Sequence, residues 1–430
     1  MINVLHITSP NPYLVAGKIV YDIHFQLGSM KNYNSKILTI GGIGQEKNGI
    51  IYLFRNKLES LYFKLKMKLL FIPKNNYDEN YYYRGEDLRK TIFSSNYILK
   101  RLMGFKPDCI IIYFNQKFLS PRNIYEIYKK TNAKIYYYLM DMSEFTGGCG
   151  YSWNCNGYQH QCGLCPAIYS NSNNDITNKI IKNKRKYLSR IDLNILCGST
   201  ELMVQAKKSV IFNRSSFYKL LIGIDEIKYN LLNDTKRDYF RKKYSLPENK
   251  RIFFVGAIGV DEKRKGFHIL KDSILMLLKL NPELLSSSHF IIAGRNAETF
   301  LKLFIEFKIG YTFLGQVSHD RLPEIYGISD FYISPSIVDS GPMMVNQSIV
   351  SGTPVIAFNI GVAKDLVINE VSGYNIPNID SFDLYIILKN AIEIPLKELN
   401  TLKKSTRNYG LGMSSVSSQI NLLDNLISVK

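Results

Sequence analysis

A loop after a short apolar run groups residues that could hold an anion. The segment SPSIVDSGPMMVNQSIVSGTPVIAFNIG, residues 334–361, places Asp339 and Gln347 on either side of a Gly-Pro-Met-Met turn where a helix is expected to begin. The first turn of a helix exposes N–H groups and a partial positive charge, which suit an anionic ligand. Whether the spacing of Asp339 and Gln347 marks a ligand site depends on the rest of the chain.

A run of cations forms a second candidate. In VGAIGVDEKRKGFHIL, residues 255–270, Lys263, Arg264 and Lys265 precede Gly266, where another helix is expected to begin. Cations at a helix N-terminus suit a diphosphate group. On its own, a Lys-rich loop in a Lys-rich chain is more often solvated surface.

Clustered cysteines form a third candidate, in TGGCGYSWNCNGYQHQCGLCP, residues 146–166. Cys149, Cys155, Cys162 and Cys165 all lie in this loop, and the last two form a C-x-x-C pair. In a cytosolic chain such thiols favour a structural zinc site, with reduced or disulfide-bridged thiols as the alternative. His160 could replace one of them as a ligand, whereas Cys109 and Cys197 lie in expected strands and fit the core.

Strand-like and helix-like segments alternate through the first half of the chain. Short apolar runs predict strands, and longer segments with helical apolar spacing predict helices. The expected elements are a strand at 2–8, a helix at 17–30, a strand at 35–40, a helix near 86–103, a strand at 109–114, a helix near 121–130, and strands at 134–140 and within 192–199. Glu201 is expected in the first turn of the helix that follows.

The alternation restarts in the second half. Strands are expected within 251–257, 289–294, 311–315, 330–336 and 353–359, and a helix at 266–280. The sequence therefore predicts an α/β protein of two Rossmann-like, doubly wound parallel-sheet domains, 1–224 and 225–412. A last helix, 413–430, is expected to pack back on the first domain. Ligands of such sheets bind beyond the carboxyl ends of the strands, and here also in a cleft between the domains.

Composition limits the partners and the location. The chain has 430 residues with 55 Lys plus Arg against 36 Asp plus Glu, a formal charge of +19. That excess suits a nucleic acid, an anionic membrane or phosphorylated ligands, although an AT-rich genome that favours lysine codons also explains it. Because no nucleic-acid-binding module is recognisable, we expect no nucleic-acid partner. Neither a transmembrane span nor a signal peptide is evident, which predicts a cytoplasmic protein.

A basic helix is expected at 55–74. One apolar stripe comprises Leu58, Leu61, Tyr62, Leu65, Leu69 and Ile72, and a second comprises Phe63, Met67, Leu70 and Phe71. One stripe can serve the core, and the other needs its own partner. A basic helix with a spare apolar face suits an anionic membrane surface, whereas the alternative is a helix wedged between two protein layers.

Taken together, these segments resemble the family 4 retaining glycosyltransferases, which have the GT-B fold. That family carries a Pro-Ser-x-x-acid turn, an acid eight residues later, and then Gly-Thr-Pro-Val. The matching residues here are Pro335, Ser336, Asp339, Gly352, Thr353, Pro354 and Gly373. The resemblance covers essentially the whole chain, and the cysteine pattern is similar to a subgroup that builds bacterial surface polysaccharides.

The resemblance implies roles for the matching residues. The implied catalytic residues are Asp141, Lys265 and Asp339, and the implied donor-binding residues are Gly17, Arg264, Lys265, Gly341, Met343, Met344 and Gln347. Lys265 and Arg264 would neutralise the diphosphate of a nucleotide-sugar, and Asp339 would bind sugar hydroxyls. Fixed positive charge stabilises the leaving phosphate, which itself takes the proton of the acceptor. Retention of configuration without a catalytic metal is therefore expected.

Three positions depart from the family. Asp339 and Gln347 stand where the family usually has Glu, and Met140 precedes Asp141 where close relatives have His. These changes either alter the sugar preference or mark a catalytically silent partner subunit of another transferase.

The expected function is hexosyl transfer from a nucleotide-diphosphate sugar to a polyprenyl-linked saccharide, in the assembly of O-antigen, capsule or exopolysaccharide. This reaction would place the protein peripherally on the inner face of a bacterial membrane. Transfer to a soluble acceptor, as in glycogen- or sucrose-type enzymes, is the other alternative.

Overall fold

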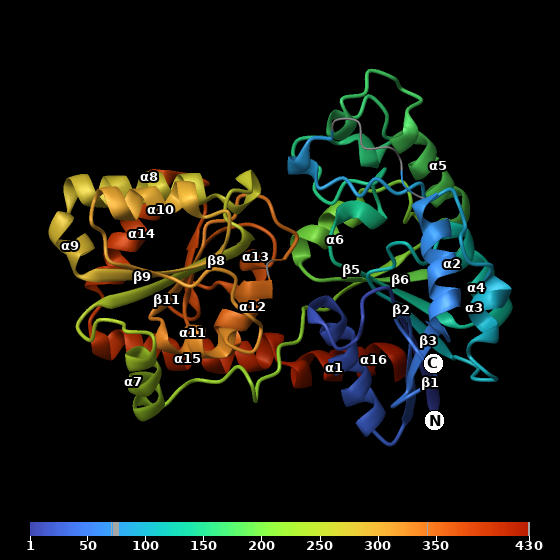
Figure 1. Ribbon diagram of the computed structural model, residues 1–430, viewed down its shortest axis with the longest axis horizontal. Coiled ribbons are helices and arrows are strands. Elements are labelled where there is room, and N and C mark those ends of the chain that lie inside the picture. Colours follow the sequence, from blue (N-terminus) through green and yellow to red (C-terminus); the bar gives the residue numbers. More distant parts are fainter. Residues whose placement is uncertain (70, 72–76, 342, 429–430) are drawn as a thin grey trace. The chain divides into compact units, whose positions relative to one another are not determined.

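The computed structural model describes residues 1–69, 71, 77–341 and 343–428, which form two compact units (Figure 1). Unit 1 comprises Met1–Leu221 and Ile420–Lys430, and unit 2 comprises Ile222–Gln419. The sequence placed the first domain boundary at 224/225 and the start of the returning segment at 413.

Unit 1 is built on a parallel sheet. Its strands are β1 (Ile2–Thr8), β2 (Tyr33–Ile43), β3 (Ile50–Phe54), β4 (Cys109–Ile112), β5 (Lys134–Leu139), β6 (Leu193–Cys197) and β7 (Ser216–Lys219). Their order is β3-β2-β1-β4-β5-β6-β7, and every pair is parallel. The central strand β4, Cys-Ile-Ile-Ile, is buried throughout, as expected for a strand covered on both faces.

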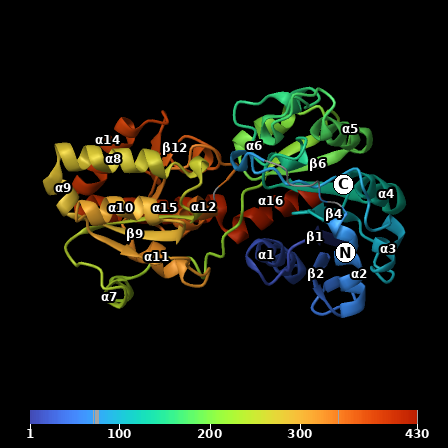
Figure 2. The ribbon, with the colours of Figure 1, turned by 45° about the horizontal axis from the view of Figure 1, so that its top comes forward.

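Helices cover this sheet (Figures 1 and 2). They are α1 (Val15–Ser29), α2 (Lys57–Lys68), α3 (Ser95–Lys100), α4 (Pro121–Thr131), α5 (Ile176–Leu188), α6 (Thr200–Lys207) and α16 (Val416–Ser428). Helix α4 shows why such boundaries are sharp. A capping box of Ser120 and Asn123 surrounds Pro121 at its start, and Asn132 in the left-handed conformation ends it.

Unit 2 repeats the plan. Its strands are β8 (Arg251–Gly259), β9 (Ser288–Arg295), β10 (Tyr311–Phe313), β11 (Phe331–Ser334), β12 (Val355–Phe358) and β13 (Gly373–Ile376), in the parallel order β10-β9-β8-β11-β12-β13. Its helices are α7 (Asp234–Lys243), α8 (Phe267–Leu280), α9 (Pro282–Ser286), α10 (Glu298–Glu306), α11 (Leu322–Ile328), α12 (Met343–Val350), α13 (Ala363–Leu366), α14 (Ser381–Glu393) and α15 (Leu396–Ser414). Both sheets are doubly wound, which confirms the predicted fold class.

The buried carboxylate of Asp330 fixes the start of β11. Asp330 accepts hydrogen bonds from the Ile252 backbone N–H at 2.8 Å and from Arg241 at 3.1 Å, and it is paired with Arg237. Burial alone would raise the pKa of Asp330, but the nearby cations of Lys403, Arg237 and Arg241 lower it below the usual value. The ionised carboxylate thus ties α7 and α15 to the middle of the sheet. Strand β11 carries the loop of Asp339 at its other end.

Two local predictions are wrong. The helix expected near 86–103 is confined to Ser95–Lys100, because the preceding segment is held by tertiary contacts: Glu86 accepts from the Lys117 N–H at 3.0 Å, and Asp87 pairs with Arg89 at 2.8 Å. The single helix expected over 413–430 is two helices, since Ser415 is extended and separates α15 from α16. Strands β3, β7 and β13 were missed.

The end of the chain lies against the sheet of unit 1. Tyr136 donates a hydrogen bond to the Leu426 carbonyl at 2.7 Å, and Tyr33 donates to Asp424. Leu423 and Ile427 of α16 are buried.

Helix α2 has one apolar stripe that faces the core and a second that is exposed, as the sequence predicts. Phe63 and Met67 pack against the core of unit 1 and Ser60 is buried, so this side faces inward. The first stripe faces outward, with Leu58 79% exposed and Leu65 55% exposed. Helix α2 ends at Lys68, short of the predicted 74, and Phe71 of the second stripe lies beyond it and is 42% exposed. Leu70 and Ile72, also assigned to these stripes, lie outside the described residues.

Candidate functional site

Two loops meet where the strand order of unit 2 reverses. Strands β8 and β11 are neighbours in the sheet, yet β9 and β10 follow on one side and β12 and β13 on the other. The loops after β8 and β11 therefore flank the switch point at the carboxyl end of the sheet, where ligands of doubly wound folds bind. The first loop carries Arg264 and Lys265, and the second carries Asp339.

The structure brings these three side chains into one ion cluster. Asp339 Oδ2 lies 2.6 Å from Lys265 Nζ and 3.0 Å from Arg264 Nη1, and Asp339 Oδ1 accepts a hydrogen bond from the Gly341 N–H at 3.2 Å. Arg264 also pairs with Glu262 at 2.7 Å. The side chains of Arg264, Lys265 and Asp339 are only 11%, 16% and 6% exposed.

The electrostatics of the cluster keep Asp339 charged. Burial alone would raise the pKa of this carboxyl, but Lys265 and Arg264 lower it below its usual value. Two cations thus balance two carboxylates, Asp339 and Glu262. An arriving diphosphate could take over the contacts of the cations while Asp339 turns to accept hydrogen bonds from hydroxyls.

Backbone contacts fix the two loops against each other. Gly266 has φ +68° and begins α8, and a Cβ atom there would lie 1.8 Å from the Pro335 carbonyl oxygen. The Ile337 N–H donates to the Arg264 carbonyl at 2.8 Å. Only glycine permits this approach, so the position of Arg264 and Lys265 relative to Asp339 is set by main chain.

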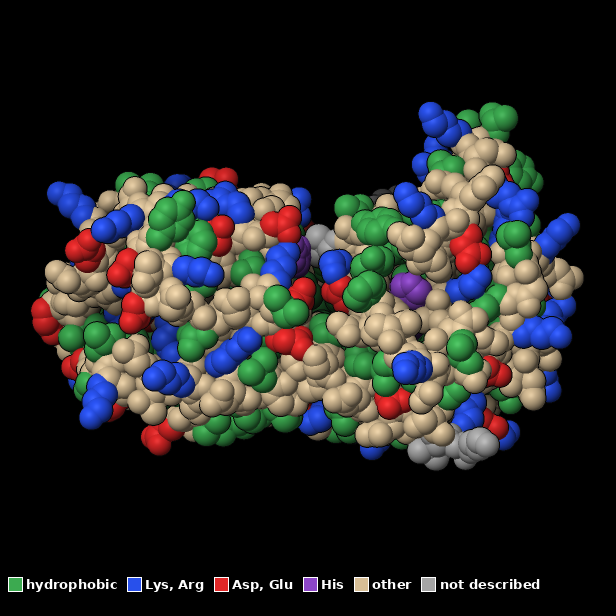
Figure 3. All heavy atoms as spheres, turned by 90° about the horizontal axis from the view of Figure 1, so that it is seen from below, with side chains coloured by type: hydrophobic (Ala, Val, Ile, Leu, Met, Phe, Trp, Pro, Cys, Tyr) green, Lys and Arg blue, Asp and Glu red, His purple; other side chains and the backbone are tan. Residues whose placement is uncertain are grey.

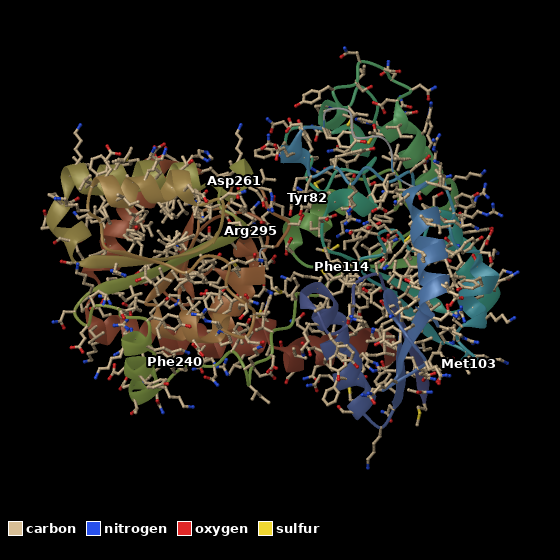
Figure 4. The ribbon with its side chains drawn as sticks, viewed as in Figure 1. Tyr82, Met103, Phe114, Phe240, Asp261 and Arg295 are labelled. Carbon is tan, nitrogen blue, oxygen red and sulfur yellow. The ribbon has the colours of Figure 1, made fainter. Side chains whose placement is uncertain are left out.

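The neighbouring residues complete the end of this sheet. Asp261 and Arg295 lie at the carboxyl ends of β8 and β9 (Figure 4), where the Val260 N–H donates to the Arg295 carbonyl at 3.0 Å. Met343 and Met344 form the first turn of α12, whose N–H groups have no acceptor within the helix. The predicted contact of these N–H groups with a donor stays a prediction.

Gln347 is part of a buried hydrogen-bond chain. Its Oε1 accepts from the Tyr326 hydroxyl at 3.2 Å, and its Nε2 donates to the Tyr229 hydroxyl at 3.0 Å. The side chain is 2% exposed. Because both ends of the carboxamide are bonded within unit 2, the predicted contact with ribose hydroxyls requires these bonds to be exchanged for bonds to the ligand.

Asp141 belongs to a separate polar network in unit 1. It follows β5, and both of its carboxylate oxygens accept from Arg84 Nη2, at 3.1 and 3.0 Å. Arg84 also contacts Glu144 at 2.8 Å. Burial lowers the pKa of Arg84, but Asp141 and Glu144 outweigh burial and raise it above its usual value. The guanidinium therefore stays charged and holds Asp141 in place.

A buried lysine completes this network. Lys184 donates to the Ser143 carbonyl and to the Thr146 carbonyl, the latter at 2.9 Å. Burial lowers the pKa of Lys184 to about 8, although Glu144 acts in the opposite direction. The segment after Asp141 is thus tied to helix α5.

Gly17 packs against its own chain. A Cβ atom at Gly17 would lie 1.9 Å from the Asn11 carbonyl oxygen, and one at Gly41 would lie 2.2 Å from the Asn11 backbone nitrogen. The loop after β1 is thereby pressed between α1 and β2. This packing explains glycine at position 17 independently of a ligand, and the predicted approach of donor phosphates stays a prediction.

The four clustered cysteines line one cavity. Cys149, Cys155, Cys162 and Cys165 surround it together with other residues, which include Tyr83, Tyr158 and Thr177. All four are free thiols. In the described part of the chain, no group of three or more His, Cys, Asp or Glu side chains is arranged to hold a metal ion.

Sequence reasoning missed the partners that fix the predicted residues. Arg84 lies 57 positions before Asp141, and nothing in the local pattern YYYRGED indicates this pairing. Glu262, Tyr229 and Tyr326 were also missed. A buried hydrogen-bond partner far along the chain leaves no periodic signal, so these contacts depend on the fold.

Sequence comparison places the ion cluster in a segment similar to known sugar transferases. Residues 236–409, less than half of the chain, match the profile of the family described as "Glycosyl transferases group 1". The mannosylfructose-phosphate synthase of Agrobacterium fabrum is 23% identical over 155 residues, which cover 33% of this chain and 32% of that protein. The chain spans about half or less of the length of the curated relatives that it matches.

Structural comparison extends to the whole chain. The sucrose-phosphate synthase of Thermosynechococcus elongatus covers 99% of this chain and 98% of its own, with a TM-score of 0.67 and 14% identity. HepE of Anabaena in complex with UDP covers 100% of both chains, with a TM-score of 0.61 and 13% identity. The fold is thus that of the GT-B glycosyltransferases.

Gly266 gives a test of the loop geometry. We expect Gly266→Ala to lower the free energy of unfolding by more than about 2 kcal/mol, because the left-handed conformation alone costs about 1–2 kcal/mol for a residue with Cβ and the contact with Pro335 adds to it. Urea denaturation measures the change.

Gly315→Ala is the matched control, since Gly315 has φ +60° with nothing within 4 Å of its Cβ position. It should lose only the conformational part. Equal losses in the two variants would show that the contact between Gly266 and Pro335 is not formed.

Proposed function

We propose that the protein is a retaining glycosyltransferase that uses a nucleotide-diphosphate sugar. The observation that carries this proposal is the ion cluster of Arg264, Lys265 and Asp339 at the switch point of unit 2. The cluster lies within residues 236–409, the part that matches a glycosyltransferase family. That HepE, a structural neighbour, has been observed with UDP supports a nucleotide donor.

The proposed roles follow from charge. Lys265 and Arg264 bind the diphosphate, so positive charge is already in place when negative charge builds on the leaving phosphate. Asp339 accepts hydrogen bonds from sugar hydroxyls, and the N–H groups of Gly341, Met343 and Met344 face the sugar and phosphate. The leaving phosphate takes the proton of the acceptor, which gives retention without a catalytic metal or a separate nucleophile.

The proposed acceptor is a polyprenyl-linked saccharide used to build a bacterial surface polysaccharide. Unit 1 would bind it beside Asp141, whose carboxylate is held by Arg84. The resemblance of the cysteine pattern to polysaccharide-building enzymes supports this choice. An acceptor of this type is anchored in a membrane, so the enzyme should carry a surface that reaches the bilayer.

The exposed side of α2 has the chemistry of such a surface. Leu58, Leu61, Tyr62, Leu65 and Leu69 are each more than half exposed. Lys57, Lys64 and Lys68 are exposed beside them, and the one acidic residue of the helix, Glu59, is bound to Tyr97 and Arg101. Apolar side chains flanked by exposed lysines fit an anionic bilayer, and we propose peripheral binding there.

Other features agree with a peripheral location. None of the helices in the described residues is long and apolar enough to cross a membrane. On the face drawn in Figure 3, Lys and Arg side chains are spread among apolar and acidic side chains instead of forming one continuous basic tract. We propose that the net charge of +19 adds a general attraction to an anionic surface and that α2 supplies the apolar contact.

The first prediction of this proposal concerns Lys265. Isothermal titration of the protein with UDP, GDP and ADP should show binding of one nucleotide. Lys265→Ala should weaken that binding at least about 10-fold, because a hydrogen bond to a charged group contributes about 1.5–3 kcal/mol and its loss leaves Asp339 facing the phosphates.

Lys279→Ala is the control, since Lys279 is an exposed lysine at the end of α8. It should leave binding unchanged. If the folded wild type binds none of the three nucleotides, or if both variants bind like wild type, the proposed donor site is wrong.

The second prediction concerns α2. In a vesicle flotation assay with anionic lipid at low salt, Lys64→Glu, Lys66→Glu and Lys68→Glu together should lower the bound fraction. A lysine near an anionic surface contributes about 1 kcal/mol, so vesicle affinity should fall about 100-fold or more.

The matched control is Lys236→Glu, Lys242→Glu and Lys279→Glu, three exposed lysines of unit 2 with the same total change in charge. An equal loss in this control would assign binding to net charge alone. Wild-type protein that does not float with anionic vesicles would contradict a membrane-anchored acceptor and favour a soluble one.

A catalytically silent partner subunit is the second candidate function. The observation that favours it is Gln347, which stands where the family has an acid and is bonded to two tyrosines. Such a subunit would stabilise another transferase, and Lys265→Ala would leave the activity of that complex unchanged.

A further inference from the structure

The loop of residues 146–175 in unit 1 has little regular structure. Apart from two short 3₁₀ turns, Gly157–Gln159 and Pro166–Ile168, it contains neither helix nor strand. Few of its apolar side chains are buried; Tyr158 and Ala167 are two of them. A segment with so little core of its own generally needs a covalent or metal crosslink to hold one conformation.

The four cysteines are placed where a crosslink would join distant parts of the loop. Cys149 lies near its start, Cys155 in the middle, and Cys162 and Cys165 on the turn near its end, and all four line the same cavity. The described cysteines are all free, so disulfides do not provide the crosslink. Four thiols around one space are the ligand set of a structural tetrahedral zinc site.

The turn that carries the last two cysteines is held in an unusual conformation. Cys162, Gly163 and Leu164 have φ of +51°, +96° and +47° in succession. A side chain at Gly163 would overlap the Asn173 carbonyl oxygen, at 2.4 Å. Residues with a Cβ atom adopt positive φ only when their surroundings impose it, and such strain gathers at ligand sites.

We propose that Cys149, Cys155, Cys162 and Cys165 bind one structural Zn²⁺ as thiolates. The thiols are not already drawn together as a metal site, so their side chains turn into the shared cavity as zinc displaces their protons. Each step of binding replaces an S–H bond with a Zn–S bond and releases a proton to solvent. His160 does not line the cavity and is not one of the proposed ligands.

The zinc site would also fix a residue of the predicted reaction. Cys149 and Tyr83 form an isolated antiparallel β-bridge, and the Arg84 N–H donates to the Gly148 carbonyl at 3.0 Å. Arg84 in turn holds Asp141 through both carboxylate oxygens. Zinc at Cys149 therefore orders the backbone that presents Arg84. This positioning role rests on the proposed function, whereas the zinc site itself does not.

The experiment is the metal content of the full chain, purified without chelator. Plasma mass spectrometry should find about one zinc per chain, and replacing zinc with Co²⁺ should give the intense thiolate-to-cobalt charge-transfer and tetrahedral d–d absorption bands. Cys162→Ser with Cys165→Ser should lose the zinc, whereas His160→Ala should keep it. If the double variant fails to fold, the cobalt spectrum of the wild type tests the proposed thiolate ligands instead.

Two results would overturn the proposal. One is folded wild-type protein that contains less than a tenth of an equivalent of zinc and takes up none when incubated with Zn²⁺ under reducing conditions. The other is a cobalt spectrum without thiolate bands. Neither readout depends on nucleotide binding or transfer, so the zinc site and the proposed function fail separately.

Discussion

The candidate donor site depends on one interaction, the buried contact of Asp339 with Lys265 and Arg264. Two cations and a carboxylate are taken largely out of water at the switch point of a parallel sheet. Their desolvation is costly, so such a cluster is weak evidence of stability and stronger evidence of use. Removing Asp339 would leave the two cations near each other, and binding a diphosphate would satisfy both.

The rest of unit 2 holds the two halves of this contact in register. Asp330 anchors the start of β11, and the loop at the other end of that strand carries Asp339. Gly266 lets the loop after β8 approach Pro335 closely enough for Arg264 and Lys265 to reach it. Unit 1 also fixes a predicted catalytic carboxylate through a charged partner. Arg84 holds Asp141, and the Arg84 backbone is hydrogen-bonded to the cysteine-bearing loop.

Local sequence predicted the elements well where one pattern decided them. Buried strands such as β4 are continuous apolar runs, so the inner strands of both sheets could be predicted, whereas the edge strands β3, β7 and β13 could not. The helix near 86–103 failed because contacts of Glu86 and Asp87 override its helical spacing. The contact between Lys265 and Asp339 links loops 74 positions apart. Family resemblance assigned both residues to one donor site, but it did not predict their ion pair. Nothing in the sequence pattern indicated the hydrogen bonds of Gln347 to Tyr326 and Tyr229.

The most direct measurement of the central claim is a crystal structure of the protein with the nucleoside diphosphate that binds it. We expect phosphate oxygens within hydrogen-bond distance of Lys265 Nζ and the Arg264 guanidinium, with Asp339 released from at least one of the two cations. A diphosphate bound elsewhere, with the contact between Asp339 and Lys265 unchanged, would contradict it.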